Sequence, residues 1–231
     1  MISNHKNTTN KVMLLGIMLC MFYIYATPLI NAPAVRQVLG LKRASFEILF
    51  LSRMLHWLLL LLAWGYAVRI EKQDFTLWKN RNYKLPKLLL HIVLLYFAVI
   101  IIATPLNLLV NWCGLHQESR QLKTIISILA HHHSMIPFIC MTAGVVEEYI
   151  FRGYIQPRLE VVFKSPLAAI LISSVLFAAV HYGYGTVINV MVPFVIGLVF
   201  SIYYWKYRNI YALIVCHFLI DFISLYATVK S

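Results

Sequence analysis

Repeated apolar runs of about 20 residues dominate this chain, and that is the length an α-helix needs to cross a bilayer. Seven such runs cover most of the 231 residues: 12–31, 46–68, 87–111, 135–156, 166–183, 186–205 and 209–228. Only helices and closed barrels satisfy every backbone hydrogen bond in lipid. The runs therefore predict an all-α, polytopic integral membrane helical bundle with about seven transmembrane helices.

The runs divide the chain into three parts. Residues 1–111 hold the N-terminal transmembrane helices, residues 112–134 form a polar loop, and residues 135–231 hold the helices with the motifs described below. The first run is long, and its end lacks the small-residue pattern of a signal-peptide cleavage site. We therefore expect it to remain as a membrane span.

The net charge of +12 would suit nucleic acid binding, but its distribution favours a membrane protein. Seventeen of the 20 Lys and Arg residues fall in the tails and loops between the runs, and an eighteenth, Lys87, is the first residue of a run. With a cytoplasmic N-terminus, twelve of them are on the inner side and six on the outer side, as the positive-inside rule requires. The expected partner is thus the lipid bilayer, and no nucleic acid is expected.

Arg53, and His56 beside it, lie toward the start of the second run, where long side chains can reach the headgroups. The cysteines are scattered and form no CxxC pair, so neither a disulfide framework nor a thiolate metal site is expected.

Three carboxylates, Glu147, Glu148 and Asp221, lie inside apolar runs although the chain has only eight acidic residues. A charged side chain at the bilayer centre costs about 3 kcal/mol on insertion scales. Such groups are retained when they pair with another group or perform chemistry. These positions are therefore the first candidates for a functional site.

The first motif is E-E-x-x-x-R at residues 147–152. On an α-helix, Glu148 and Arg152 are four residues apart and share one face, so they can form an ion pair. Glu147 is turned about 100° away and cannot share that partner. It is left in a low-dielectric site where it could act as a general base. The alternative is that both glutamates are structural members of ion pairs.

Two further motifs each contain a histidine. Phe177 and His181 share one helical face, and so do His217 and Asp221. A carboxylate beside an imidazole fixes its tautomer and supports either an imidazolium or metal ligation, although a buried structural pair is also possible. Together the motifs could activate a water and stabilise an oxyanion. No serine or cysteine occupies a motif position as a nucleophile, so water attack on an amide is the favoured chemistry.

The order E-E-x-x-x-R, F-x-x-x-H, H-x-x-x-D on successive apolar segments resembles the CPBP (Abi) family of intramembrane proteases. This family is related to the type II CAAX prenyl endopeptidase and to bacteriocin-processing and self-immunity proteins. The resemblance covers about residues 135–228. It implies a membrane endopeptidase of the glutamic type, a group formerly classed as metalloproteases.

The resemblance also implies a role for each motif residue. Glu147 would activate the water with help from His181, and His217 and Asp221 would form the oxyanion site. Glu148 and Arg152 would form the supporting ion pair. Some relatives have asparagine at the position of Asp221; because an ionised aspartate cannot donate a hydrogen bond, Asp221 must be protonated, orient His217 or bind a metal.

No cofactor and no metal are expected. The alternative is zinc, held by two histidines and a carboxylate from the motif positions. The candidate zinc ligands are His181, His217, Asp221 and Glu147.

The favoured function is hydrolysis of a peptide bond in a membrane-associated peptide or protein. The candidate processes are processing of a bacteriocin or pheromone precursor, bacteriocin self-immunity and CAAX-like cleavage, in a bacterial cell membrane. One alternative is a non-catalytic membrane bacteriocin-immunity protein that acts by binding. Another is a small transporter or proton relay, because buried Glu and His residues also mark ion paths.

Overall fold

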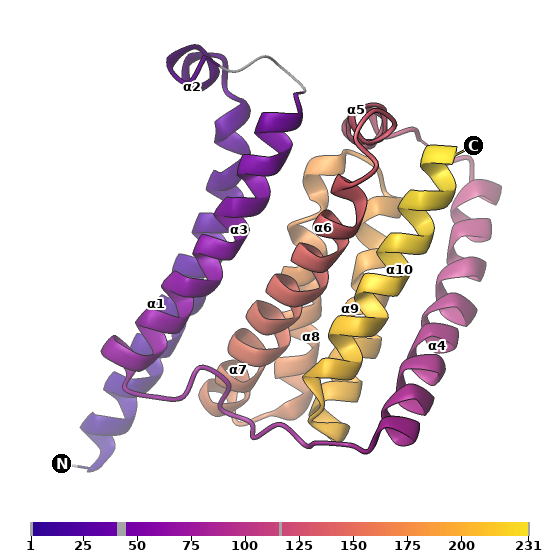
Figure 1. Ribbon diagram of the computed structural model, residues 1–231. Helices are drawn as coiled ribbons and strands as arrows, with labels where there is room; N and C mark the ends of the chain where they lie inside the picture. The colour runs from indigo at the N-terminus through magenta and orange to yellow at the C-terminus, as the bar shows by residue number, and fades with distance from the viewer. Residues whose placement is uncertain (1, 41–44, 116, 231) are drawn as a thin grey trace.

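The computed structural model describes residues 2–40, 45–115 and 117–230, excluding the side chains of residues 2–8 and 31. Lys42 and Arg43, which entered the charge distribution above, lie outside the described residues, and so does the side chain of Lys6. The described chain is helical and contains no strand (Figure 1), which confirms the prediction of an all-α bundle.

Long helices alternate with short 3₁₀ segments (η1, η5) and π-helical segments (η2, η3, η4). In chain order the elements are α1 (Ile2–Ala26), η1 (Thr27–Asn31), α2 (Pro33–Val38), α3 (Phe46–Tyr66), η2 (Ala67–Glu71), α4 (Leu85–Trp112), α5 (Arg120–Leu129), α6 (Met135–Thr142), η3 (Ala143–Glu147), η4 (Tyr149–Ile155), α7 (Gln156–Phe163), α8 (Pro166–Ala179), η5 (Tyr182–Tyr184), α9 (Ile188–Tyr207) and α10 (Ile210–Lys230).

Six helices within the described ranges are long and apolar enough to cross a membrane, so this is a multi-pass membrane protein. They are Thr9–Ile30, Phe46–Glu71, Leu85–Trp112, Pro166–Tyr184, Ile188–Tyr207 and Ile210–Lys230. The predicted run 135–156 is not among them, so the expected count of seven is not confirmed. That part of the chain is a helical segment broken by η3 and η4, and it carries several ionisable side chains. It nevertheless lies alongside its neighbours (Figure 1), with α6 against α10 and α7 against α8.

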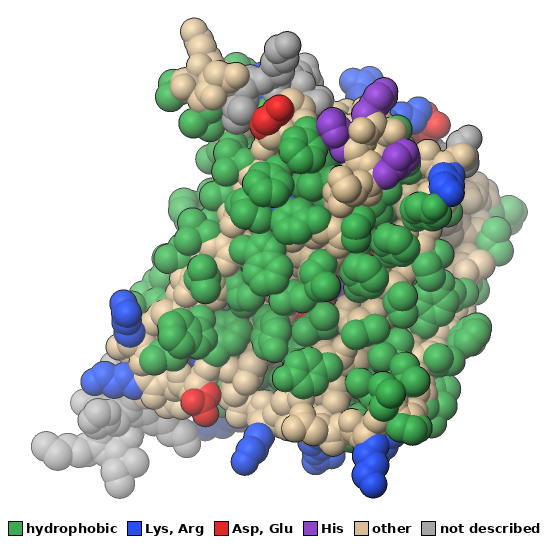
Figure 2. Space-filling model, in the orientation of Figure 1, with side chains coloured by type: hydrophobic (Ala, Val, Ile, Leu, Met, Phe, Trp, Pro, Cys, Tyr) green, Lys and Arg blue, Asp and Glu red, His purple; other side chains and the backbone are tan. Residues whose placement is uncertain are grey.

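The bundle is organised around α6–α10. Helix α4 packs on α9 and α10 at one side, and the pair α1 and α3 lies at the other side (Figure 1). Apolar side chains cover the middle of the surface, while Lys and Arg side chains lie toward its two ends (Figure 2). Large apolar residues of α4, such as Leu94, Phe97 and Ile101, are exposed. A surface of this kind is suited to contact with lipid.

Local sequence signals explain some of the helix boundaries. Ser165 caps α8, because its hydroxyl accepts a hydrogen bond from the N–H of Ala168, and Pro166 occupies the first turn. Ser45 caps α3 in the same way. These signals account for where the helices begin, but they do not decide which face of each helix turns inward.

The π-helical segment η3 packs closely against α10. A Cβ atom at Gly144 would lie 2.8 Å from the carbonyl oxygen of Ile214, which is too close for any side chain. A π-helical turn is wider than an α-helical turn, and such turns are often found at functional sites. The close approach at Gly144 places the glutamates that follow it next to the middle of α10.

A second buried polar cluster joins the N-terminal helices to α7. Arg158 donates two hydrogen bonds to Glu71 Oε2, from Nε at 2.7 Å and from Nη2 at 2.5 Å. The hydroxyl of Tyr154 donates to Glu71 Oε1 at 2.6 Å. Neither Glu71 nor Arg158 exposes any of its side chain. Arg158 was expected among the basic residues of an inner loop, but in the structure it is buried inside the protein.

We predict that Arg158→Met destabilises the fold, because it leaves the carboxylate of Glu71 buried without its cation. Removing one partner of a buried ion pair costs about 3–5 kcal/mol. Thermal unfolding of the purified protein in detergent measures this effect, with Lys79→Met in the exposed loop as the matched control. Equal unfolding temperatures for the two variants would contradict the structural role of the pair.

Candidate active site

Glu148 is the centre of the site, and its side chain is fully buried. Its Oε1 atom accepts a hydrogen bond from Arg152 Nη1 at 3.0 Å, which is the ion pair expected from the spacing. The same oxygen accepts a second hydrogen bond from His217 Nδ1 at 2.7 Å. Glu148 therefore connects its own helical segment to α10.

Arg152 is held from three further directions. Its Nη2 atom donates to the carbonyl oxygen of Gly197 on α9 at 3.4 Å. Its guanidinium group lies over the rings of Phe177 and Phe200, at 4.2 Å and 5.5 Å from the ring centroids. A buried cation stacked on aromatic faces and bound to a carboxylate is well compensated for its loss of water. The motif residue Phe177 thus supports Arg152.

His217 is oriented by Glu148, whereas orienting His217 was one of the three roles expected for Asp221. The distance from His217 Nε2 to Asp221 Oδ2 is 3.6 Å, which is too long for a hydrogen bond. Nδ1 must be the donor toward the carboxylate of Glu148, so Nε2 is the ring atom left for another partner. The side chain of Asp221 is one-third exposed, at 33%.

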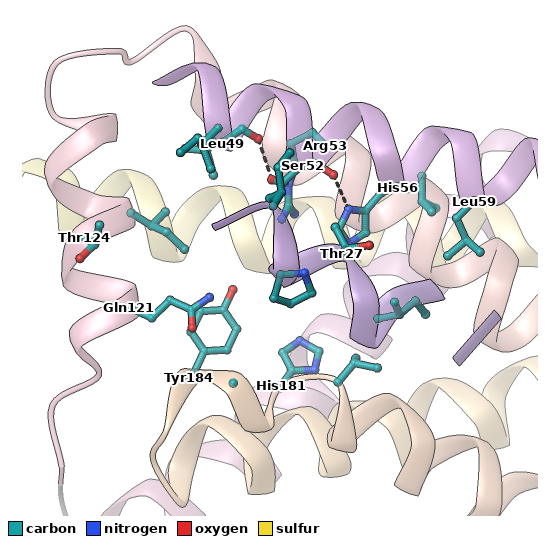
Figure 3. A pocket seen from close by; sticks show the side chains of 18 of the residues that line it. Thr27, Leu49, Ser52, Arg53, His56, Leu59, Gln121, Thr124, His181 and Tyr184 are labelled. Atoms are coloured by element: carbon teal, nitrogen blue, oxygen red, sulfur yellow. Dashed lines mark hydrogen bonds between the residues drawn. The ribbon is translucent and has the colours of Figure 1, made fainter. Parts of the chain in front are cut away.

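A cavity of about 830 Å³ lies beside this cluster. Its walls come from η1, α2, α3, α5, η3, η4 and η5, and Figure 3 shows the side chains that point into it. Glu147 and His181 both line it, whereas His217 and Asp221 are not among its lining residues. Electrostatic interactions still connect Glu147 to His217 and His181, so the predicted residues form one charged cluster.

Glu147 differs from Glu148 in its position, because Glu147 lines the cavity and Glu148 is not among its lining residues. Its Oε2 atom is buried and has no hydrogen-bond partner among the described residues. An unpaired carboxylate oxygen beside a cavity can accept a hydrogen bond from water. This is the environment that a water-activating base requires.

One ring nitrogen of His181 can interact with a water or a substrate in the cavity. Its Nδ1 atom lies 2.9 Å from the carbonyl oxygen of Phe177. Because a carbonyl oxygen only accepts, Nδ1 carries the proton, and Nε2 of the neutral ring is left as an acceptor. The ring is partly exposed, so Nε2 is accessible from the cavity.

One face of α3 forms a wall that the sequence analysis did not find. The lining residues of α3 and its cap recur at helical spacing: Ser45, Ile48, Leu49, Ser52, Arg53, His56 and Leu59. Arg53 and His56 were expected to reach the headgroups, and in the structure they face the cavity instead (Figure 3). Their spacing of three residues was a visible signal, but both lie on a helix whose other faces are also apolar.

The zinc alternative depends on how the donor atoms are grouped. Among the described residues, no three His, Cys, Asp or Glu side chains are grouped so that they could hold a metal ion. His217 Nδ1 is already bound to Glu148, and His181 Nδ1 faces a backbone carbonyl. These contacts leave Nε2 of each ring as the atom that could bind a metal, so the expectation of a metal-free site stays a prediction.

Residues 129–223 match the family model described as type II CAAX prenyl endopeptidase Rce1-like. The match includes every motif residue from Glu147 to Asp221, and it confirms the resemblance to the CPBP/CAAX protease family. No curated protein and no solved structure matches the chain. The fold and this match define a multi-pass membrane protein with a segment similar to type II CAAX prenyl endopeptidases.

The different contacts of the two glutamates predict different effects on stability. Glu148→Gln should lower the thermal unfolding temperature, because buried Arg152 loses its counter-charge, at a cost of about 3–5 kcal/mol. Glu147→Gln should lower it less, because it removes only longer-range attractions to the neighbouring histidines and Arg53 and leaves the ion pair of Arg152 intact. Both variants are compared with the wild type by thermal unfolding in one detergent. Equal shifts in the two variants would contradict this division.

Proposed function

We propose that this protein is an intramembrane endopeptidase in which Glu147 activates a water that attacks a peptide carbonyl. One observation carries the proposal: the unpartnered carboxylate oxygen of Glu147 lies beside a cavity that His181 also lines. The match to the Rce1-like family over the same segment supports a protease. We propose that the reaction uses no metal ion; in the described part of the chain, no three His, Cys, Asp or Glu side chains are grouped so that they could hold one.

The proposed reaction assigns a task to each group. The water lies between Glu147 Oε2 and His181 Nε2, and Glu147 takes its proton as the hydroxide adds to the carbonyl carbon. His217, held at Nδ1 by Glu148, donates from Nε2 to the oxyanion. Asp221, near that nitrogen, balances the positive charge of the imidazolium.

The charges around the cavity favour a substrate with an anionic group. Its lining includes Arg36, Arg53 and Arg120, whereas Glu147 is the one acidic residue among the described lining residues. A free carboxyl terminus is the anionic group that every peptide carries, and guanidinium groups bind carboxylates well. We therefore propose a substrate that is cleaved close to its C-terminus, in keeping with a CAAX-like tail or a short peptide precursor.

The proposed orientation of the chain determines on which side of the membrane the cavity opens. Its exposed lining residues Pro33, Arg120 and Gly183 belong to α2, α5 and η5, at the end of the bundle opposite the start of α1 (Figure 1). With the N-terminus in the cytoplasm of a bacterial cell, this end faces outward. That arrangement favours a bacteriocin or pheromone precursor over a cytoplasmic tail.

The central test is cleavage by purified protein in lipid vesicles. A prenylated CAAX peptide, its unprenylated form and a peptide-pheromone precursor serve as probes, and mass spectrometry locates the cleaved bond. Glu147→Gln and His181→Ala should each lower kcat by about 10²–10⁴-fold, as expected for lost acid–base groups. Glu160→Gln, a glutamate of α7 outside the cavity lining, is the matched control.

Full activity of Glu147→Gln would defeat the proposed mechanism. Protection of cells against a bacteriocin by Glu147→Gln, without any cleavage, would instead identify an immunity protein that acts by binding. pH-dependent ion flux without cleavage would identify a transporter or proton relay.

Substitution of Arg53 tests whether the cavity recognises the C-terminal carboxylate of the substrate. Arg53→Met should raise KM for a peptide with a free C-terminus by about tenfold, since a hydrogen bond to a charged group is worth about 1.5–3 kcal/mol. The same peptide with an amidated C-terminus should show little change between wild type and variant. An equal rise in KM for both peptides would exclude this role for Arg53.

A further inference from the structure

A second histidine faces the cavity, from the wall opposite His181. Figure 3 shows His56 projecting from α3 on one side and His181 projecting from the end of α8 on the other. His56 interacts electrostatically with Glu147 and with Arg53. It belongs to the N-terminal helices, outside the segment that matches the protease family.

The two histidines are held in the same way. His56 Nδ1 lies 2.6 Å from the carbonyl oxygen of Ser52, four residues earlier on its helix, just as His181 Nδ1 faces Phe177. Nδ1 must therefore be the donor in His56 as well, since the carbonyl oxygen only accepts. This leaves Nε2 of His56 as the titrating atom on the cavity side.

None of the residues assigned so far protonates the leaving nitrogen in the proposed reaction. When the C–N bond breaks, the leaving nitrogen needs a proton, because an amide anion is too basic to leave by itself. Glu147 and His181 are engaged with the water, and His217 is engaged with the oxyanion. A proton donor is needed on the other side of the peptide, and His56 occupies that side of the cavity.

We propose that His56 is a catalytic residue that donates the proton from Nε2 to the leaving nitrogen, an inference that rests on the proposed function above. Glu147 takes one proton from water, and the hydroxide oxygen bonds to the carbonyl carbon. The C–N bond then breaks, and the nitrogen takes the proton of the His56 imidazolium. The proton on Glu147 returns to His56. The elements of one water are thus divided between the acid and the amine products.

The experiment compares two leaving groups. The peptide found to be cleaved by the wild type is one substrate, and its acyl part as the p-nitrophenyl ester is the other. The phenolate of the ester leaves without a proton, so it does not need His56. His56→Gln should lower kcat for the amide by about 10²-fold or more and change ester hydrolysis by less than about tenfold. His181→Gln should lower both rates together, because it acts on the water.

Retained ester hydrolysis in His56→Gln also shows that the variant is folded and that its water attack is intact. His133→Gln, an exposed histidine before α6, is the control and should change neither rate. Equal losses of amide and ester hydrolysis in both His56→Gln and His56→Ala would overturn the proposal, and so would unchanged amide hydrolysis. Failure of the wild type to cleave any peptide would overturn the proposed function instead.

Discussion

The buried carboxylate of Glu148 is the interaction on which the site depends. It holds Arg152 on its own segment and His217 on α10 with a single oxygen atom. Arg152 in turn reaches α9 and lies against aromatic rings of α8 and α9. One charged centre inside the membrane bundle thereby joins the helices that carry all three motifs. Because an unpaired charge at this depth is costly, the helices are bound together in one register.

This network also separates the tasks of the two adjacent glutamates. Glu148 Oε1 binds Arg152 and His217, whereas Glu147 lines the cavity; Oε2 of each glutamate has no hydrogen-bond partner among the described residues. The π-helical segments on either side of Glu148 form wide turns at this point and bring Gly144 close to the backbone of α10. The result is a structural carboxylate and a chemically available one at neighbouring positions.

Much of the bundle and the local pairing could be predicted from the sequence. Apolar runs of bilayer length predicted the helical membrane fold, and the spacing of Glu148 and Arg152 predicted their ion pair. The segment 135–156 was read as one apolar span, and the structure shows a helix with two π-helical breaks. The amino-acid composition does not distinguish a π-helical turn from an α-helical turn, because the same residues fit both.

The sequence by itself determined that this protein lies in lipid, and which side chains can contact each other within one helix. Length, hydropathy and four-residue spacing are local properties of the chain. The tertiary structure decided that His217 binds Glu148, 69 residues away, that Arg158 is buried, and that His56 faces the cavity. In a soluble helix the apolar stripe shows which face turns inward. Lipid is as apolar as a protein core, so these helices are apolar on all sides, and only their packing against one another selects the inward face.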